Sequence, residues 1–251
     1  TGKEVVLWAD TFTTWFEPEN ARSALAVLQA AGYRVHLAKA QDGSRPLCCG
    51  RTFLSTGLVD EARREAQRTL KALLPFVARG VPIVGLEPSC LLTLRDEFKV
   101  LLASEDANQL ANVAYLFEEF IVKELDAGRF KVSFQSLPQQ KGLLHGHCHQ
   151  KAFGLMDSIE RTLQMIPNLK VETINSSCCG MAGAFGYDAQ NIEISKRMGE
   201  LVLFPKIRQA AEETLIIADG TSCRHQIANG TSRRAEHVAC TLERALPKIE
   251  G

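Results

Sequence analysis

The chain has 251 residues, of which 45% are hydrophobic and 23% are charged, and its formal net charge at pH 7 is zero. This length allows one large domain or two small ones, each with a sizeable core. The neutral charge excludes the basic surface typical of proteins that bind nucleic acids or anionic membranes. No apolar run reaches the roughly 18–20 residues that a membrane span needs.

The first part of the chain alternates short apolar runs, typical of buried strands, with the spacing of amphipathic helices. Strands are expected at residues 5–9, 33–37 and 81–86. Helices are expected at 18–32, 58–77 and 93–102, and from about residue 108 onward. Residues 129–140 are polar and without periodicity, which predicts a connector there.

The same order then recurs. Strands are expected at residues 142–145, 169–174 and 214–218, and helices at 154–165, at 190–208 with a break at Pro205, and at 236–246. Strands that alternate with helices favour parallel βαβ units with right-handed crossovers. We therefore predict an α/β fold of two pseudo-repeated Rossmann-like halves, each a small parallel sheet flanked by helices. The expected units are 1–128 and 141–251, joined by the connector.

Cysteines mark the repeat. Cys48-Cys49-Gly50 and Cys178-Cys179-Gly180 lie 130 residues apart (179 − 49), and Cys90 and Cys223 lie 133 apart (223 − 90). Adjacent cysteines bridge to each other only with strain, and no export signal is visible. The pattern therefore favours reduced thiolates that bind a metal or a cluster in the cytoplasm over disulfides. Because the chain begins with Thr1 and not with Met, we expect it to be part of a longer protein.

The expected ligands gather at one rim of each half, since each cysteine follows a predicted strand and sites form at the carboxyl ends of parallel strands. The second half supplies four of them, Cys148, Cys178, Cys179 and Cys223, and the first half supplies three, Cys48, Cys49 and Cys90. The first half has no cysteine at the position of Cys148, so we expect the better-kept site in the second half and a degenerate one in the first.

Residues beside the cysteines suit an anionic group. Gly180 and Gly183 let the backbone approach closely, and a helix N-terminus after them would favour negative charge. His147 or His149 is interpreted as a metal ligand, as a proton donor or as a hydrogen-bond partner of sulfur, with an ordinary structural histidine as the equal alternative. His225 and Arg51 are candidate residues of the outer shell.

These turns resemble the cysteine-rich CCG domain family, whose pattern is a cysteine, a Cys-Cys-Gly turn and a Cys-x-x-Cys, present in two copies. The family includes a component of heterodisulfide reductase, the iron–sulfur components of glycolate oxidase and of anaerobic glycerol-3-phosphate dehydrogenase, and lactate-utilisation proteins. The segment 218–226 looks most like the C-terminal region of FAD-linked D-2-hydroxyacid dehydrogenases. The chain departs from the family pattern at Glu87 and Gly220, which stand where each Cys-x-x-Cys begins. Glu87 is a further candidate for the outer shell.

The resemblance implies an iron–sulfur redox module, a domain or subunit of an oxidoreductase and not a complete enzyme. It would pass electrons from a flavin-dependent 2-hydroxyacid dehydrogenase, of the lactate, glycolate or 2-hydroxyglutarate type, to an acceptor. The departures favour a four-thiolate 4Fe–4S cluster over the family's five-thiolate cluster. FAD is expected only on another domain or subunit, and the implied partners are that flavin dehydrogenase and a ferredoxin-like iron–sulfur domain. The implied location is cytoplasmic, peripheral to a membrane only through partners. A zinc site built from the same cysteines and a non-redox assembly domain are the alternatives.

Overall fold

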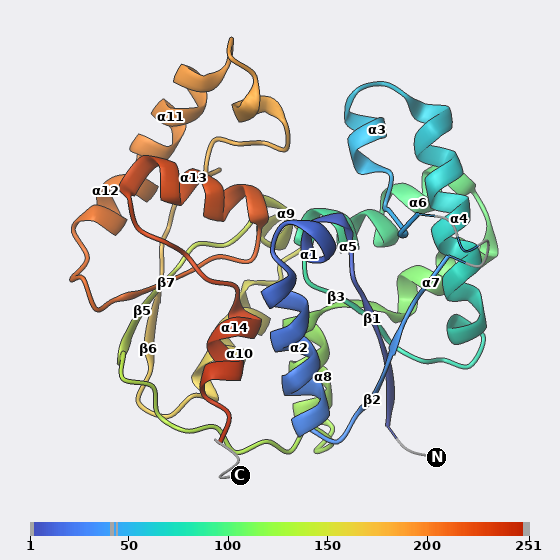
Figure 1. Ribbon diagram of the computed structural model, residues 1–251, viewed down its shortest axis with the longest axis horizontal. Helices are drawn as coiled ribbons and strands as arrows, with labels where there is room; N and C mark the ends of the chain where they lie inside the picture. The colour runs from blue at the N-terminus through green and yellow to red at the C-terminus, as the bar shows by residue number, and fades with distance from the viewer. Residues whose placement is uncertain (1–2, 41–42, 44, 248–251) are drawn as a thin grey trace. The chain divides into compact units, whose positions relative to one another are not determined.

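The computed structural model describes residues 3–40, 43 and 45–247, and the chain divides into two compact units, Thr1–Lys131 and Val132–Gly251. Each unit contains one parallel sheet and its own helices (Figure 1).

The first unit has a four-stranded sheet in the order β2-β1-β3-β4, with every neighbouring pair parallel. Its strands are β1 (Glu4–Trp8), β2 (Arg34–Leu37), β3 (Ile83–Gly85) and β4 (Ala114–Leu116). Its helices are α1 (Thr11–Trp15), α2 (Pro18–Ala30), α3 (Arg51–Ser55), α4 (Val59–Val77), α5 (Pro88–Arg95), α6 (Glu97–Leu102), α7 (Glu105–Val113) and α8 (Phe117–Asp126). In Figure 1, α3, α6 and α7 lie around α4, which contacts each of them.

The second unit has a three-stranded parallel sheet in the order β6-β5-β7. Its strands are β5 (Lys141–Leu144), β6 (Lys170–Thr173) and β7 (Leu215–Ile217). Its helices are α9 (Cys148–Ala152), α10 (Met156–Gln164), the 3-10 turn η1 (Phe185–Tyr187), α11 (Ile192–Glu200), α12 (Leu203–Arg208), α13 (Thr221–Thr231) and α14 (Val238–Arg244). In Figure 1, α11, α12 and α13 pack together, while α10 lies with α14.

The two sheets confirm the predicted fold class and its internal repeat. The order β2-β1-β3 in the first unit matches β6-β5-β7 in the second, so the first strand of each unit is the central one. In both units a short helix follows that strand, capped by Asp10 before α1 and by His147 before α9. Residues at matching steps of the two units can therefore be compared directly.

The helix expected from about residue 108 onward is interrupted, which corrects the prediction. Strand β4 separates α7 from α8 and pairs with β3 in the register Ile83↔Ala114. Ala114 and Leu116 are buried. Strand β4 thus supplies hydrogen-bond partners for the edge of β3 that would otherwise be open. This pairing depends on tertiary structure, so helical periodicity in the sequence does not reveal it.

Three other element predictions were wrong. The helix expected at 93–102 is divided between α5 and α6, which are separated at Asp96. The helix expected at 190–208 ends at Glu200, and Pro205 lies in the first turn of α12, where a proline costs no helical hydrogen bond. Helix α13 was missed because its sequence is polar, contains Gly230 and has little apolar periodicity.

Within the described parts of the chain, no helix is both long enough and apolar enough to cross a bilayer.

Candidate metal centre

The second Cys-Cys turn follows β6 and directs backbone amides at its own sulfurs. The N–H of Gly180 donates to Cys178 Sγ at 3.3 Å, and the N–H of Ala182 also bonds this sulfur. The N–H of Met181 bonds Cys179. The turn curls because Gly180, Ala182 and Gly183 have φ values of 103°, 42° and 70°. Such successive amides form a concave site for negative charge.

The other two thiols of this unit come from the first turns of helices. Cys148 is the first residue of α9 and Cys223 is the third residue of α13. Partial positive charge at a helix N-terminus stabilises a nearby thiolate. Three strand ends therefore bring four thiols to one place.

These four thiols form a continuous chain of contacts. Cys148 is hydrogen-bonded to Cys178, Cys178 to Cys179, and Cys179 to Cys223. The hydrogen bonds from Cys148 and Cys179 lower the pKa of Cys178, and the hydrogen bond from Cys179 lowers the pKa of Cys223. The hydrogen bond to Cys178, followed by burial, raises the pKa of Cys148, and hydrogen bonds to Cys178 and Cys223 raise the pKa of Cys179. The lowered pKa values of Cys178 and Cys223 favour thiolates at these two positions, and the thiolate is the form that binds metals.

A histidine lies against the two buried thiols. Within the described part of the chain, His145, Cys179 and Cys223 are the one group of three His, Cys, Asp or Glu side chains whose donor atoms all lie within 4.8 Å of one another. All three residues are buried, whereas Cys148 and Cys178 are half-buried. The predicted candidates His147 and His149 are not in this group. His145 was not among the ligands expected from the sequence, although its place directly after an apolar strand was a signal for it.

The Cys-Cys turn is fixed against α11 and α13. The side-chain amide of Gln226 donates to Cys179 O at 3.1 Å and to Ser195 O at 3.1 Å. A Cβ atom on Gly180 would lie 2.1 Å from Ser195 O, so only glycine fits there. Sequence reasoning missed Gln226 and Ser195 because their role depends on three elements that are distant in the chain.

A buried polar network holds the two helix starts that carry Cys148 and Cys223. Gln150 accepts from the N–H of His147 at 2.9 Å and donates to Asp219 Oδ2 at 2.9 Å. Arg224 is buried and donates to the carbonyl oxygens of Ala218 and Asp219 at 2.8 and 2.7 Å. Buried polar groups that are fully bonded in this way rigidify a site.

The other histidines predicted for the second site have defined positions. His147 is buried as the N-cap of α9, and its Nδ1 accepts from the N–H of His149 at 3.1 Å. The rings of His147 and His149 stack with their centroids 5.2 Å apart. His225 Nδ1 lies 2.8 Å from the Tyr187 hydroxyl in η1. Of the three, His147 contributes to the lowered pKa of Cys223, after the hydrogen bond from Cys179 and together with His145.

The helix expected after the glycines of this turn, from residue 190, is present as α11, which begins at Ile192 after the 3-10 turn η1. The curled amides of the turn and the starts of α9 and α13 also carry positive potential. Cys240, which the sequence left outside the candidate site, is half-buried in α14.

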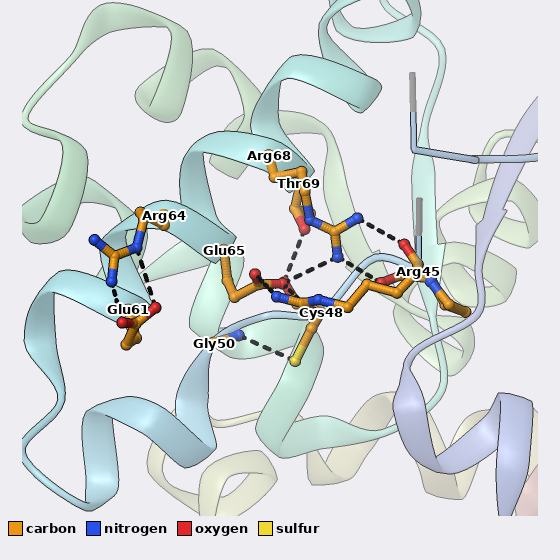
Figure 2. A network of polar contacts seen from close by, with 9 residues as sticks. Arg45, Cys48, Gly50, Glu61, Arg64, Glu65, Arg68 and Thr69 are labelled. Atoms are coloured by element: carbon orange, nitrogen blue, oxygen red, sulfur yellow. Dashed lines mark hydrogen bonds and ion pairs between the residues drawn. The ribbon is translucent and has the colours of Figure 1, made fainter. Parts of the chain in front are cut away.

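The first unit repeats the geometry of the Cys-Cys turn. The N–H of Gly50 donates to Cys48 Sγ at 3.4 Å, and Gly50 has a φ of 78°. Cys49 Sγ lies 3.4 Å from Cys90 Sγ, and both thiols are buried. Figure 2 shows how α4 holds this turn: Thr69 Oγ1 donates to Cys48 O at 2.8 Å. The same helix contributes Glu65 and Arg68, which pair with each other and reach the segment before the turn (Figure 2).

The first unit differs where ligands would be needed. Thr11, the first residue of α1, takes the place of Cys148, and its side chain bonds Cys48 as Cys148 bonds Cys178. Glu87, the N-cap of α5, lies near Cys90. A hydrogen bond from Cys49 lowers the pKa of Cys90, but burial and the charges of Asp10 and Glu87 raise it to about 12. Burial and Glu87 also raise the pKa of Asp10 to about 6.

Arg51 does not direct its side chain at sulfur. Its guanidinium pairs with Glu97 and reaches Thr93 Oγ1 at 3.4 Å, while its backbone N–H bonds Cys49. The arginine therefore joins α3 to α5 and α6, and its contribution to the cysteines comes from the main chain.

The donor sets of the two units differ in their fit to a metal cluster. The second unit offers four thiols and backbone amides that bond two of them. It also has Gly180, where an added Cβ would clash with Ser195, and a buried histidine nitrogen that makes no hydrogen bond of ordinary geometry in the described residues. These features fit a thiolate-bound metal group. The first unit offers three thiols beside two acidic side chains, and fits such a group less well.

Fold and site together define a duplicated α/β chain whose second unit carries a four-cysteine centre. No protein-family model matches the chain. Curated proteins do match it, and one of them is a component of anaerobic glycerol-3-phosphate dehydrogenase from Escherichia coli K12, 29% identical over 244 residues. That match covers 97% of this chain and 59% of the relative, so the chain spans little more than half the length of this protein.

Two further kinds of relative match nearly the whole chain. D-2-hydroxyglutarate dehydrogenase of Pseudomonas putida is 27% identical over 239 residues, or 94% of this chain and 22% of the enzyme. Lactate utilization protein A 2 of Bacillus cereus strain Q1 is 24% identical over 260 residues, or 98% of this chain and all of the relative. The chain is thus a homologue of dehydrogenase-associated proteins of the kinds that its cysteine pattern predicts, and this resemblance is confirmed.

Proposed function

We propose that this chain is an iron–sulfur redox module of a flavin-linked dehydrogenase system. The observation that carries the proposal is the meeting of Cys148, Cys178, Cys179 and Cys223 in the second unit. Four cysteine thiolates are the ligand set of a 4Fe–4S cluster. When bound, such a cluster takes up and releases single electrons.

The residues of the chain would hold this group and set its surroundings. The amides of Gly180 and Ala182 donate to Cys178, and hydrogen bonds to ligand sulfur raise the reduction potential of a cluster. Cys179 and Cys223 belong to an apolar cluster with Ile174 and Phe204, which excludes water from one side of the site. Cys148 and Cys178 are half-buried and would form the side facing an electron donor or acceptor.

The homologues suggest what delivers the electrons. Their names connect related chains with the dehydrogenation of glycerol-3-phosphate and 2-hydroxyglutarate and with the utilization of lactate. We propose that a flavin on another domain or subunit oxidises a 2-hydroxyacid and reduces the centre in this chain, with a ferredoxin-like domain as a second partner. The chain itself would carry electrons and not bind the substrate.

Anaerobic purification followed by iron, zinc and acid-labile sulfide analysis tests the proposal. We expect iron and sulfide, with a broad visible absorbance that dithionite bleaches. The variant Cys178→Ser should lose most of the iron, whereas Cys240→Ser, a matched half-buried thiol in α14, should keep it. About one zinc per chain without sulfide would refute the redox function and select the zinc alternative, to which the group His145, Cys179 and Cys223 is also suited.

The electron path has its own test. The iron-loaded chain is mixed anaerobically with the flavin dehydrogenase and its 2-hydroxyacid. Its visible absorbance should then decrease as it does when dithionite is added. Retention of full activity in a dehydrogenase complex that carries both Cys178→Ser and Cys179→Ser would instead indicate an assembly domain.

A further inference from the structure

His145 has a buried nitrogen atom that the fold itself does not use. The residue is fully buried after β5, and its Nδ1 lies 3.0 Å from Ser176 Oγ. Its Nε2 is buried and makes no hydrogen bond of ordinary geometry among the described residues, and the ring also interacts with the sulfur of Cys223. A buried polar atom without a hydrogen bond costs about 1–3 kcal/mol of folding free energy. Most such atoms in native proteins therefore have a bonding partner.

The ring lies beside two buried thiols, an arrangement of donor atoms that suits a metal. The donor atom of His145 lies within 4.8 Å of the sulfurs of Cys179 and Cys223, all of them buried. Histidines that bind metals typically use their other ring nitrogen in a hydrogen bond that fixes the ring. Ser176 provides that bond, and Lys151 Nζ, which donates to Ser176 O at 2.6 Å, holds the serine segment in place.

The second unit also lacks a thiol at the place where a further cysteine would stand. Gly220 occupies that position, and a Cβ atom there would lie 2.4 Å from Cδ2 of His147 and 3.3 Å from Cys223 Sγ. The His147 ring therefore excludes a larger residue from position 220. His145 approaches the same sulfur from the central strand, so the unit can complete its donor set with nitrogen.

We propose that His145 Nε2 is a direct ligand of the metal centre in the second unit, beside Cys179 and Cys223. The proposal rests on the proposed function for the presence of a metal group. Because each iron of a 4Fe–4S cluster takes one terminal ligand, the imidazole would replace one thiolate of the set. Imidazole and thiolate together suit iron and zinc.

Protein labelled with ¹⁵N only at histidine and purified anaerobically tests this ligation. If the chain carries iron and sulfide, pulsed electron paramagnetic resonance of the reduced protein should show one strongly coupled ¹⁵N nucleus. His145→Gln should abolish that coupling. His225→Gln, which removes a histidine of the same unit bonded to Tyr187, should keep it.

A second variant separates ligation from folding. Ser176→Ala leaves the His145 imidazole in place and removes its partner, so the coupling should persist while metal affinity falls by about 10–100-fold. A loaded wild-type protein without a strongly coupled nitrogen would overturn the inference and leave the redox function standing.

The remaining outcomes also decide between the two proposals. If the chain carries zinc without sulfide, the redox function fails, and X-ray absorption at the zinc edge should show an imidazole ligand that His145→Gln removes. A zinc site with sulfur ligands alone would overturn the histidine ligand as well. A chain that retains neither metal under anaerobic conditions refutes both.

Discussion

Gly180 is the residue on which the Cys-Cys turn most depends, and Gly180→Ala tests this directly. Its φ of 103° is a conformation in which other residues cost about 1–3 kcal/mol. The added Cβ would lie 2.1 Å from Ser195 O, so the turn or α11 has to move before ordinary contact is possible. Such overpacking costs about 1–3 kcal/mol more. Gln226 bonds both Cys179 O and Ser195 O, so it would resist that movement.

Gly183→Ala is the matched control in the same turn. Gly183 also has a positive φ, 70°, but apart from its chain neighbours no heavy atom of the described residues lies within 4 Å of the position of its Cβ. It should therefore cost about 1–2 kcal/mol, from the backbone alone. Urea unfolding of the anaerobically loaded variants, with iron measured per chain, should show a larger loss of stability and of iron for Gly180→Ala. Equal losses in the two variants would refute the argument from close approach.

Two further predictions concern the first unit. Thr11→Cys places a thiol where the second unit has Cys148, so it should increase the iron bound per chain, and Thr11→Ser should not. Unchanged iron in the cysteine variant would mean that the first unit lacks more than this one ligand. Glu124 accepts from Arg129 Nε at 2.8 Å, and the arginine holds the pKa of this carboxyl below its usual range. A carboxylate with a lowered pKa stabilises the fold above its unfolded pKa of about 4.3, and this stability is lost as the pH falls through the folded pKa. Glu124→Gln should thus lower the melting temperature at pH 7 and make little difference at pH 3, and a gap of the same size at both pH values would contradict the prediction.

Much of the fold could be predicted because the buried strands are apolar and the longer helices are periodic. Helix α4 was expected at 58–77 and spans Val59–Val77, with Ala66 and Leu73 buried as their spacing indicates. Strand β4 and helix α13 escaped prediction for opposite reasons. Strand β4 is short and lies within a stretch of helical periodicity. Helix α13 is too polar to show an apolar helical periodicity.

The site was predictable in its sulfurs and not in its other atoms. The cysteines follow strand ends, and parallel strands bring their ends to one edge, so sequence order alone predicts that they meet. The positions of His145 and Gln226 depend on ring direction and on contacts between elements distant in the chain. The amides on Cys178 depend on left-handed residues, one of which, Ala182, is not a glycine.

The two units differ in electrostatics more than in shape, and this explains why the second is the better candidate. Near Cys90 the first unit places Asp10 and Glu87, whose negative charges raise the pKa of the thiol and so oppose a thiolate and an anionic cluster. At the matching positions the second unit has His147 and Gly220, neither of which is acidic, and the pKa of Cys223 is lowered, first by the hydrogen bond from Cys179 and then by His145 and His147. The first unit also has one thiol fewer, because Thr11 stands at the position that Cys148 occupies in the second unit. We infer that one fold, used twice, differs in metal affinity through residues at the starts of α1 and α5.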